Sequence, residues 1–267
     1  MLWEVVMDFG GLGLVVAGLV VGFIVGMTGV GGGSLMTPIL LWFGVNPATA
    51  VGTDLLYAAI TKSGGVWVHK RNDNIDWKIT GWLTMGSVPA VLLTLWFLSS
   101  LHAAPDAMNA VIKQALGVVL LLTAAAVFFK KRLLAFAHNR AGGSYNPSGK
   151  SLNALTVFTG LILGTMVALT SIGAGALGTV ALFILYPFLA TRRLVGTEIA
   201  HAVPLTLVAG LGHAGMGNMD WGILGFLLLG SLPGIYLGSH LAGRVSDDIL
   251  RPCLAIMLAF IGYKLVF

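Results

Sequence analysis

The stretch Met27-Thr28-Gly29-Val30-Gly31-Gly32-Gly33-Ser34-Leu35 interrupts the first long apolar segment of the chain. A long apolar run precedes it and a short apolar run follows. A variant, Leu169-Thr170-Ser171-Ile172-Gly173-Ala174-Gly175-Ala176-Leu177, occurs in the second half of the chain. We term these stretches the first break (residues 27–35) and the second break (residues 169–177). Helices broken in this way are where small ligands bind inside many membrane proteins.

The composition around the breaks indicates an integral membrane protein. Charged residues make up 9% of the chain and hydrophobic residues 57%, whereas about a quarter of a soluble domain is charged. Several apolar stretches approach the roughly 20 residues that cross a bilayer as a helix. No Lys or Arg occurs in residues 1–4, so we expect the first apolar segment to be a retained span and not a signal peptide. The single Cys253 excludes an internal disulfide.

Ten apolar segments are predicted, five on each side of a polar linker that contains Gly and Pro. We therefore divide the chain into a first transmembrane repeat (1–132), a cytoplasmic linker (133–150) and a second transmembrane repeat (151–267). The segments are 11–28, 34–44, 47–69, 77–99, 107–129, 151–170, 176–187, 192–213, 221–242 and 249–266.

The two halves repeat each other in sequence. Gly52-Thr53-Asp54 matches Gly196-Thr197-Glu198 at an offset of 144 residues (196 − 52). The same offset relates His69 to His213, Asp76-Trp77 to Asp220-Trp221, and the stretch 86–89 to 230–233. Because each half has an odd number of segments, the second half must be inverted in the membrane. Inverted repeats are a common architecture of secondary transporters.

Lys and Arg favour the cytoplasmic side of a membrane, and this predicts the orientation. Most basic residues fall in the linker or in loops on the same side of the membrane as the linker, such as Lys70-Arg71 and Arg192-Arg193. We therefore expect a multi-pass protein of the bacterial inner membrane with both termini in the periplasm. His69 and His213 are expected at helix ends, in the interface.

The second segment of each half is too short to span the bilayer. Each short helix should begin near the membrane centre, where its free N–H groups and partial positive charge attract an anion. Glycine would let the backbone approach the ligand, and hydroxyl groups could donate hydrogen bonds. An alternative is that the glycines only permit close helix packing. The candidate substrate-binding residues are Thr28, Gly29, Gly31, Gly32, Gly33, Ser34, Thr53, Thr170, Ser171, Gly173, Gly175 and Thr197.

Asp54 and Glu198 are the acidic residues that lie well inside predicted spans, at equivalent positions. An intramembrane carboxyl group is costly, so a functional role is the default interpretation. Either residue could carry a coupled proton, or it could tie helices together as a hydrogen-bonded group. Lys62 could balance the charge of an anion or of Asp54, or extend to the interface. His201, one turn after Glu198, is placed for a proton relay, and Tyr57 is its counterpart.

Other polar residues and prolines have simpler interpretations. Asp76 and Asp220 are predicted to cap the helices that follow them. Pro89 and Pro233 fall inside helices, where each should produce a kink that could serve as a hinge. Ser87 and Ser231 could satisfy the backbone groups that the prolines free.

These motifs resemble those of the sulfite exporter TauE/SafE family of bacterial membrane permeases. The resemblance rests on the first break followed by Pro38, on Ala50-Val51-Gly52-Thr53-Asp54, and on the second-half counterparts Gly173-Ala174-Gly175 and Val195-Gly196-Thr197-Glu198. It covers nearly the whole chain. It implies transport of small sulfur-containing anions such as sulfite, sulfonates or thiosulfate. The second break departs from the pattern, with fewer glycines and no proline at the place of Pro38.

The sequence therefore predicts an all-α membrane protein with two inverted five-segment repeats and short, glycine-preceded helices that meet near the midplane. We expect a secondary transporter that exports a small sulfur-containing anion by alternating access and can be proton-coupled. An anion channel and an uptake carrier for another small organic acid are alternatives. Because no HExxH or other catalytic motif occurs, we expect no enzyme activity, cofactor, metal or nucleic-acid partner.

Overall fold

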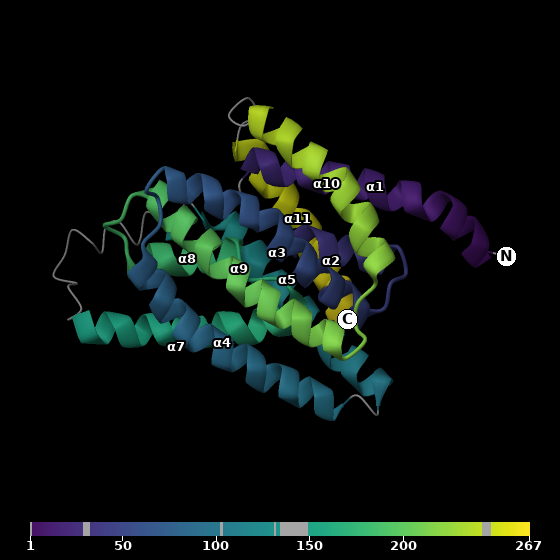
Figure 1. Cartoon of the computed structure of the whole chain (residues 1–267), viewed down its shortest axis with the longest axis horizontal. Helices are drawn as coiled ribbons and strands as arrows, with labels where there is room; N and C mark the ends of the chain where they lie inside the picture. Colours follow the sequence, from purple (N-terminus) through teal and green to yellow (C-terminus); the bar gives the residue numbers. More distant parts are fainter. Residues whose placement is uncertain (1, 29–32, 102–103, 131, 134–148, 242–246) are drawn as a thin grey trace.

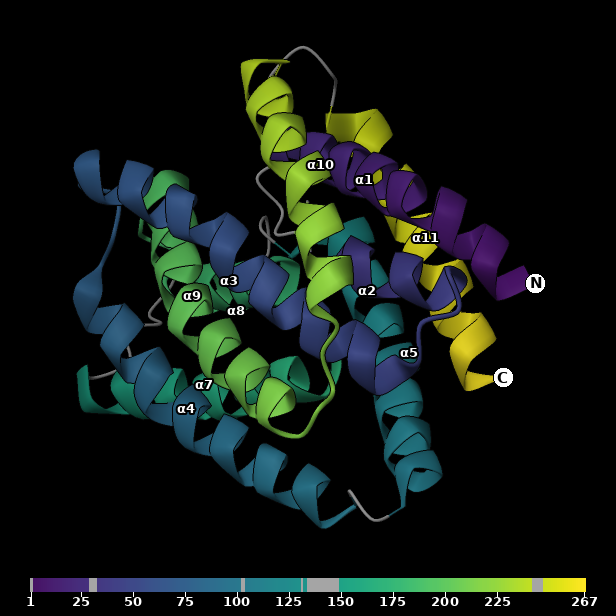
Figure 2. The ribbon, with the colours of Figure 1, turned by 45° about the vertical axis from the view of Figure 1, so that its right-hand side comes forward.

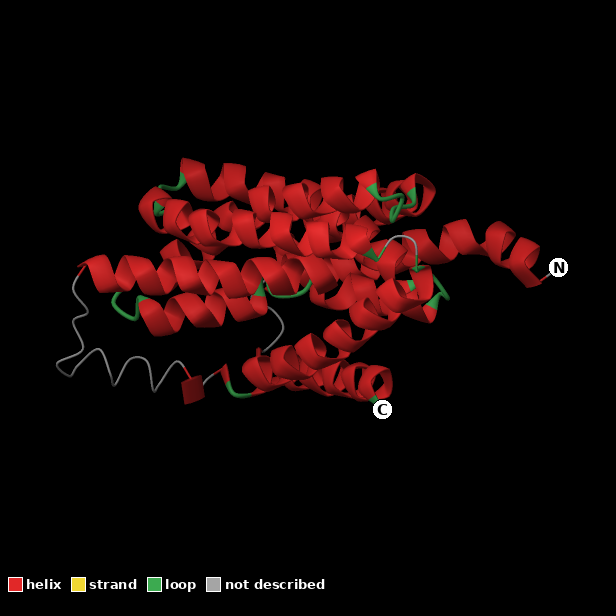
Figure 3. Cartoon of the chain, turned by 90° about the horizontal axis from the view of Figure 1, so that it is seen from below, coloured by secondary structure: helices red, strands yellow, loops and turns green. Residues whose placement is uncertain are grey.

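The chain is all-helical in the part that the computed structural model describes, residues 2–28, 33–101, 104–130, 132–133 and 149–241 with 247–267. No strand occurs in these residues (Figure 3). The helices of the first half are α1 (Leu2–Thr28), α2 (Gly33–Trp42), α3 (Pro47–Arg71), α4 (Trp77–Ser100) and α5 (Pro105–Phe128). Those of the second half are α7 (Gly149–Thr170), α8 (Ala176–Leu185), α9 (Thr191–Gly215), α10 (Trp221–Leu241) and α11 (Asp247–Val266).

Five of the described helices are long and apolar enough to cross a membrane, namely α4, α5, α7, α9 and α10. The helix α3 has 25 residues, like α9, but it carries Asp54 and Lys62 in its interior. Large apolar side chains are exposed on the outer helices, for example Leu93 and Trp96 on α4 and Leu229 on α10. Such an apolar exterior suits a lipid environment, and it confirms the predicted all-α membrane fold.

The two halves are interlocked, because helices of one half pack mainly on helices of the other. α1 lies along α10, and α4 lies along α7, on opposite sides of the pair α3 and α9 (Figures 1 and 2). α5 packs on α11, and further contacts join the halves, such as those between α4 and α9. No single half therefore forms a separate bundle in the described structure.

Glycines set the close approach within the outer pairs. A Cβ atom on Gly22 of α1 would lie 2.5 Å from the carbonyl oxygen of Ser231 on α10. A Cβ atom on Gly164 of α7 would lie 2.4 Å from the carbonyl oxygen of Ser87 on α4. Small residues at helix interfaces allow backbones to touch in this way, and the gain comes from van der Waals packing.

These two contacts are the same contact made twice, with the roles of the two halves reversed. Gly22 corresponds to Gly164, because each lies six residues before the threonine of its break, Thr28 or Thr170. Ser87 corresponds to Ser231 at the offset of 144 residues, so each half gives the same contact to the other. Such an exchange is what a twofold relation between the halves would produce. It supports the interpretation of the sequence as two repeats, while the division at residues 132 and 150 and the inversion across a membrane stay predictions.

The short helices are present as predicted. The sequence predicted short segments at 34–44 and 176–187, and the structure has α2 (Gly33–Trp42) and α8 (Ala176–Leu185), each of 10 residues. A helix of this length spans roughly half of a bilayer core of about 30 Å. Both pack on the central helices, α2 on α3 and α8 on α9. The central helices α3 and α9 hold the buried polar residues.

The predicted helix caps are confirmed. The carboxylate of Asp76 accepts hydrogen bonds from the backbone N–H groups of Lys78 and Ile79 at the start of α4. Asp220 accepts from the N–H of Ile223 at 2.9 Å, at the start of α10. These bonds satisfy donors that a helix N-terminus would otherwise leave unpaired.

Candidate functional site

Asp54 is completely buried on α3. The hydroxyl of Thr37, one turn inside α2, donates a hydrogen bond to its Oδ2 atom. Its Oδ1 atom has no hydrogen-bond partner among the described residues. Ser171 of the second break lies close enough to interact with this carboxyl group. Asp54 therefore joins the short helix of the first half to the break of the second half.

Glu198 occupies the equivalent position on α9 and is 3% exposed. It lies against the first turn of α8, because a Cβ atom on Gly178 would be only 3.2 Å from its Oε1 atom. That oxygen has no hydrogen-bond partner within the described part of the chain. Buried polar atoms are usually paired, so an unpaired carboxyl oxygen beside a helix N-terminus points to a place where a proton or ligand binds.

Lys62 lies between these groups. Its ammonium group donates a hydrogen bond to the carbonyl oxygen of Ala174 in the second break. It is also within electrostatic range of both Asp54 and Glu198. The side chain is 8% exposed, so the structure favours charge balance over an extension to the interface. We term Asp54, Lys62, Glu198 and the second break the central cluster.

The second break has the loosened backbone that its sequence suggests. Gly173 has a φ of +124° and Ser171 a φ of +58°, values that L-residues with side chains rarely adopt. The N-cap of α8 is Gly175, and no side chain caps it among the described residues. The positive end of α8 thus faces the central cluster, and the carboxyl group of Glu198 lies beside it without capping it.

The hydroxyl groups of the second break differ in availability. Thr170 accepts from the N–H of Ile172 at 3.1 Å and donates to the carbonyl of Met166 at 2.6 Å. Ser171 is 2% exposed, and its hydroxyl forms no hydrogen bond to the described groups, although the carboxyl group of Asp54 lies close to it. Ser171 is therefore better placed than Thr170 to donate to a ligand.

The first break gives less information. Gly29, Gly31 and Gly32 lie outside the described residues. The backbone of α1 ends at Thr28 and that of α2 begins at Gly33 followed by Ser34. Substrate contact by these six residues stays a prediction.

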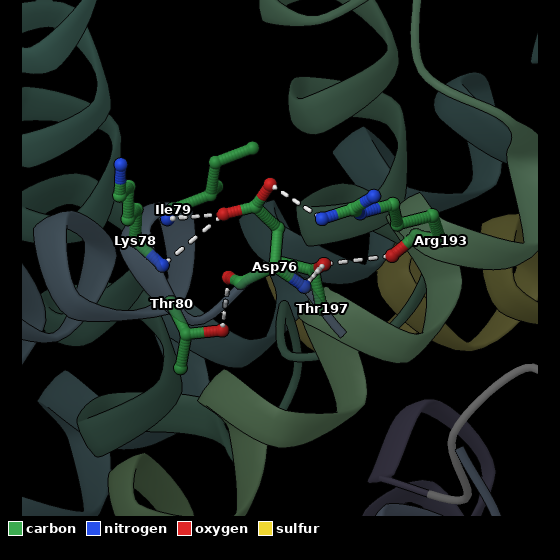
Figure 4. Close-up of polar contacts among 6 residues, drawn as sticks. All are labelled: Asp76, Lys78, Ile79, Thr80, Arg193 and Thr197. Carbon is green, nitrogen blue, oxygen red and sulfur yellow. Dashed lines mark hydrogen bonds and ion pairs between the residues drawn. The ribbon is translucent and has the colours of Figure 1, made fainter. Parts of the chain in front are cut away.

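Thr53 and Thr197 each accept a hydrogen bond from the backbone of a loop in the opposite half. Thr53 accepts from the backbone N–H of Asp220 at 3.1 Å, and Thr197 accepts from that of Asp76 at 2.9 Å (Figure 4). The hydroxyl of Thr197 also donates to the carbonyl of Arg193 at 2.7 Å. The structure therefore gives both threonines a clear role in joining the halves, and substrate contact by either stays a prediction.

His201 and its counterpart Tyr57 extend the cluster along α9 and α3. The Nε2 atom of His201 lies 2.9 Å from the hydroxyl of Ser87 on α4. The hydroxyls of Tyr57 and Ser231 occupy the equivalent positions, and neither forms a hydrogen bond within the described part of the chain. Ser87 thus pairs with His201, which differs from the predicted role of satisfying backbone freed by Pro89.

The remaining predictions concern the prolines and two histidines. Pro89 and Pro233 lie inside α4 and α10, as expected, while their use as hinges stays a prediction. His69 and His213 lie in the last turns of α3 and α9, at helix ends as predicted, while their place at a membrane interface stays a prediction. The side chain of His213 is fully buried within the protein, and its Nε2 atom lies 2.9 Å from the carbonyl oxygen of Ala168. The close packing of α9 against α3, which puts His213 beside Gly52, accounts for this burial.

Sequence reasoning missed two members of the site. Thr37 was not singled out, although a buried hydroxyl near a predicted intramembrane acid could have been found from its place in the short helix. Gly178 was also missed, because its contact with Glu198 depends on how α8 packs on α9. The only sign of this contact in the sequence is that Gly178 is a small residue in the first turn of a predicted helix.

Comparison with known proteins identifies the family. Residues 14–265 match the family described as sulfite exporter TauE/SafE. The chain belongs to the sulfite exporter TauE/SafE family. It is 40% identical over 253 residues to the probable membrane transporter protein YjnA of Bacillus subtilis, covering 95% of this chain and 98% of that protein. It is also 26% identical to the probable membrane transporter protein MJ0441 of Methanocaldococcus jannaschii, covering 93% and 92%. No solved structure matches significantly.

Membership of the TauE/SafE family makes this protein a membrane transporter, which agrees with its apolar helices. The match extends over both halves, including α3, α8 and α9. The central cluster therefore lies within the part of the chain that defines the family.

Proposed function

We propose that this TauE/SafE protein is a secondary transporter that moves a small sulfur-containing anion, of the sulfite, sulfonate or thiosulfate class, across the bacterial inner membrane by alternating access. The observation that carries the proposal is Lys62, a buried cation that bonds to the second break beside the start of α8, which no described side chain caps. A cation, a helix N-terminus and the hydroxyl of Ser171 are together suited to an oxyanion.

The charges of the central cluster favour coupling to protons. If Asp54 and Glu198 were both ionised, Lys62 would leave one negative charge in excess. A bound monoanion would raise the excess to two, inside a buried region where uncompensated charge is very costly. We therefore propose that the anion binds together with a proton on one carboxyl group.

Joint binding of anion and proton has a consequence for direction. Transport of a monoanion with one proton moves no net charge, so the membrane potential would not drive it. The anion gradient and the pH gradient would set the direction. We expect export when the anion accumulates in the cytoplasm.

Purified protein in liposomes tests this function. Vesicles loaded with labelled sulfite, thiosulfate or a small sulfonate should release at least one of them in a saturable manner. Lys62→Gln should reduce this flux at least tenfold, because a hydrogen bond to a charged group contributes about 1.5–3 kcal/mol. Lys113→Gln is the matched control, since Lys113 is exposed on α5. Equal flux in both variants would refute the role of Lys62, and no flux of any sulfur anion would refute the proposed substrate class.

A further inference from the structure

A pocket lies apart from the central cluster, where the starts of α4 and α7 meet the loop between α8 and α9. It has a volume of about 330 Å³. Its apolar wall includes Trp82, Leu152 and Phe188, and its polar groups include Lys78 and Asn153. We term it the α4–α7 pocket. An inorganic anion would gain little from the apolar wall, whereas a ligand with both a charge and a hydrocarbon part would use both sides.

The one carboxylate of the α4–α7 pocket, that of Asp76, already has its partners. Its Oδ1 atom accepts from two backbone N–H groups at the start of α4, and its Oδ2 atom lies 3.3 Å from Arg193 (Figure 4). The side chain of Lys78 extends away from Asp76 in the same view. The ammonium group of Lys78 is therefore available to a ligand, and the negative charge of Asp76 is largely compensated.

The surroundings of the pocket are basic and interfacial. Lys150 precedes Asn153 by three residues on α7, so the two share a helix face. Arg192 is exposed beside the loop. Trp77 is 56% and Phe188 is 67% exposed, and aromatic side chains of this kind gather at membrane–water interfaces. The distribution of Lys and Arg assigns this side of the molecule to the cytoplasm.

We propose that the α4–α7 pocket binds the headgroup of an anionic phospholipid. Lys78 contacts the phosphate, and Asn153 offers an amide donor beside it. The apolar wall accommodates the glycerol and the first part of an acyl chain. Basic pockets between transmembrane helices on the cytoplasmic side recognise anionic lipids by this combination.

Lipid binding to the purified protein tests the proposal. Detergent-solubilised protein is titrated with phosphatidylglycerol and, separately, with phosphatidylcholine, and bound lipid is counted by native mass spectrometry. Lys78→Gln should weaken phosphatidylglycerol binding about fivefold, the effect of one basic side chain near an anionic lipid, and should leave phosphatidylcholine unchanged. Asn153→Phe, which fills the pocket, should weaken phosphatidylglycerol binding at least as much.

The matched control is Lys70→Gln, which removes an exposed positive charge at the end of α3, outside the pocket. It should bind phosphatidylglycerol as the wild type does. An equal loss in Lys70→Gln and Lys78→Gln would overturn the proposal in favour of general surface charge. Displacement of the lipid by excess inorganic phosphate or sulfite would overturn it in favour of a small-anion site. Unchanged binding in both pocket variants would also contradict it.

Discussion

Replacing Gly86 by alanine should weaken the contact between α4 and α7. A Cβ atom at Gly86 would lie 1.9 Å from the carbonyl oxygen of Val157 on α7. Because real Cβ atoms essentially never come closer than 3.0 Å, the two helices must separate by at least 1.1 Å there (3.0 − 1.9). Added atoms in a well-packed interior cost about 1–3 kcal/mol. Because both sides of this contact are backbone, no side chain can move aside, and the clash itself should lower the free energy of unfolding by this amount.

Gly81→Ala on the same helix is the matched control. A Cβ atom at Gly81 meets nothing within 4 Å, and both substitutions bring the same gain in helix propensity, about 1 kcal/mol. The difference between the two variants therefore isolates the contact. Gly230 and Gly225 form the equivalent pair on α10, where a Cβ atom at Gly230 would lie 1.9 Å from the carbonyl of Val15 and one at Gly225 is free.

The assay is reversible unfolding in mixed micelles with a rising fraction of sodium dodecyl sulfate. Gly86→Ala should be less stable than Gly81→Ala by about 1–3 kcal/mol, and Gly230→Ala less stable than Gly225→Ala by a similar amount. Equal stability within either pair would refute the interlocked packing of the halves.

Three further changes test the central cluster and its supports. Asp54→Asn or Glu198→Gln should flatten the pH dependence of flux, because neither amide can take up the proton that accompanies the anion; profiles identical to wild type in both would leave hydrogen bonding as the role of these groups. Pro89→Ala or Pro233→Ala should slow turnover more than it weakens substrate binding, since a straighter helix favours one access state; unchanged turnover at normal protein levels would reduce the prolines to packing features. Thr197→Val should lower the free energy of unfolding by about 1 kcal/mol through the lost bond to the N–H of Asp76, whereas Thr197→Ser should keep it; equal losses would count against that bond.

The sequence predicted the helices and the short segments because their signals are local. Apolar runs, glycine breaks and the caps Asp76 and Asp220 lie close together along the chain. The spacing of matching motifs also predicted which positions of the two halves are equivalent, so Asp54 and Glu198 could be recognised as counterparts without a structure.

The contacts that complete the site depend on tertiary packing, and the sequence does not encode them locally. Lys62 was recognised as a buried or interfacial cation, but its partner is the carbonyl of Ala174 in the other half. Thr37 reaches Asp54 because α2 folds back onto α3. The burial of His213 cannot be predicted from the sequence, because a helix end gives no sign that a neighbouring helix covers it.

The central claim is that the protein carries a sulfur-containing anion together with a proton. Counterflow of labelled sulfite in proteoliposomes, recorded with the vesicle potential and the internal pH, tests it most directly. At a pH where sulfite is present as the monoanion hydrogen sulfite, we predict accelerated exchange when unlabelled sulfite is present on the far side, net flux that follows a pH gradient, and no response to an imposed potential. Flux without counterflow, driven by the potential and indifferent to pH, would contradict the account and indicate an anion channel.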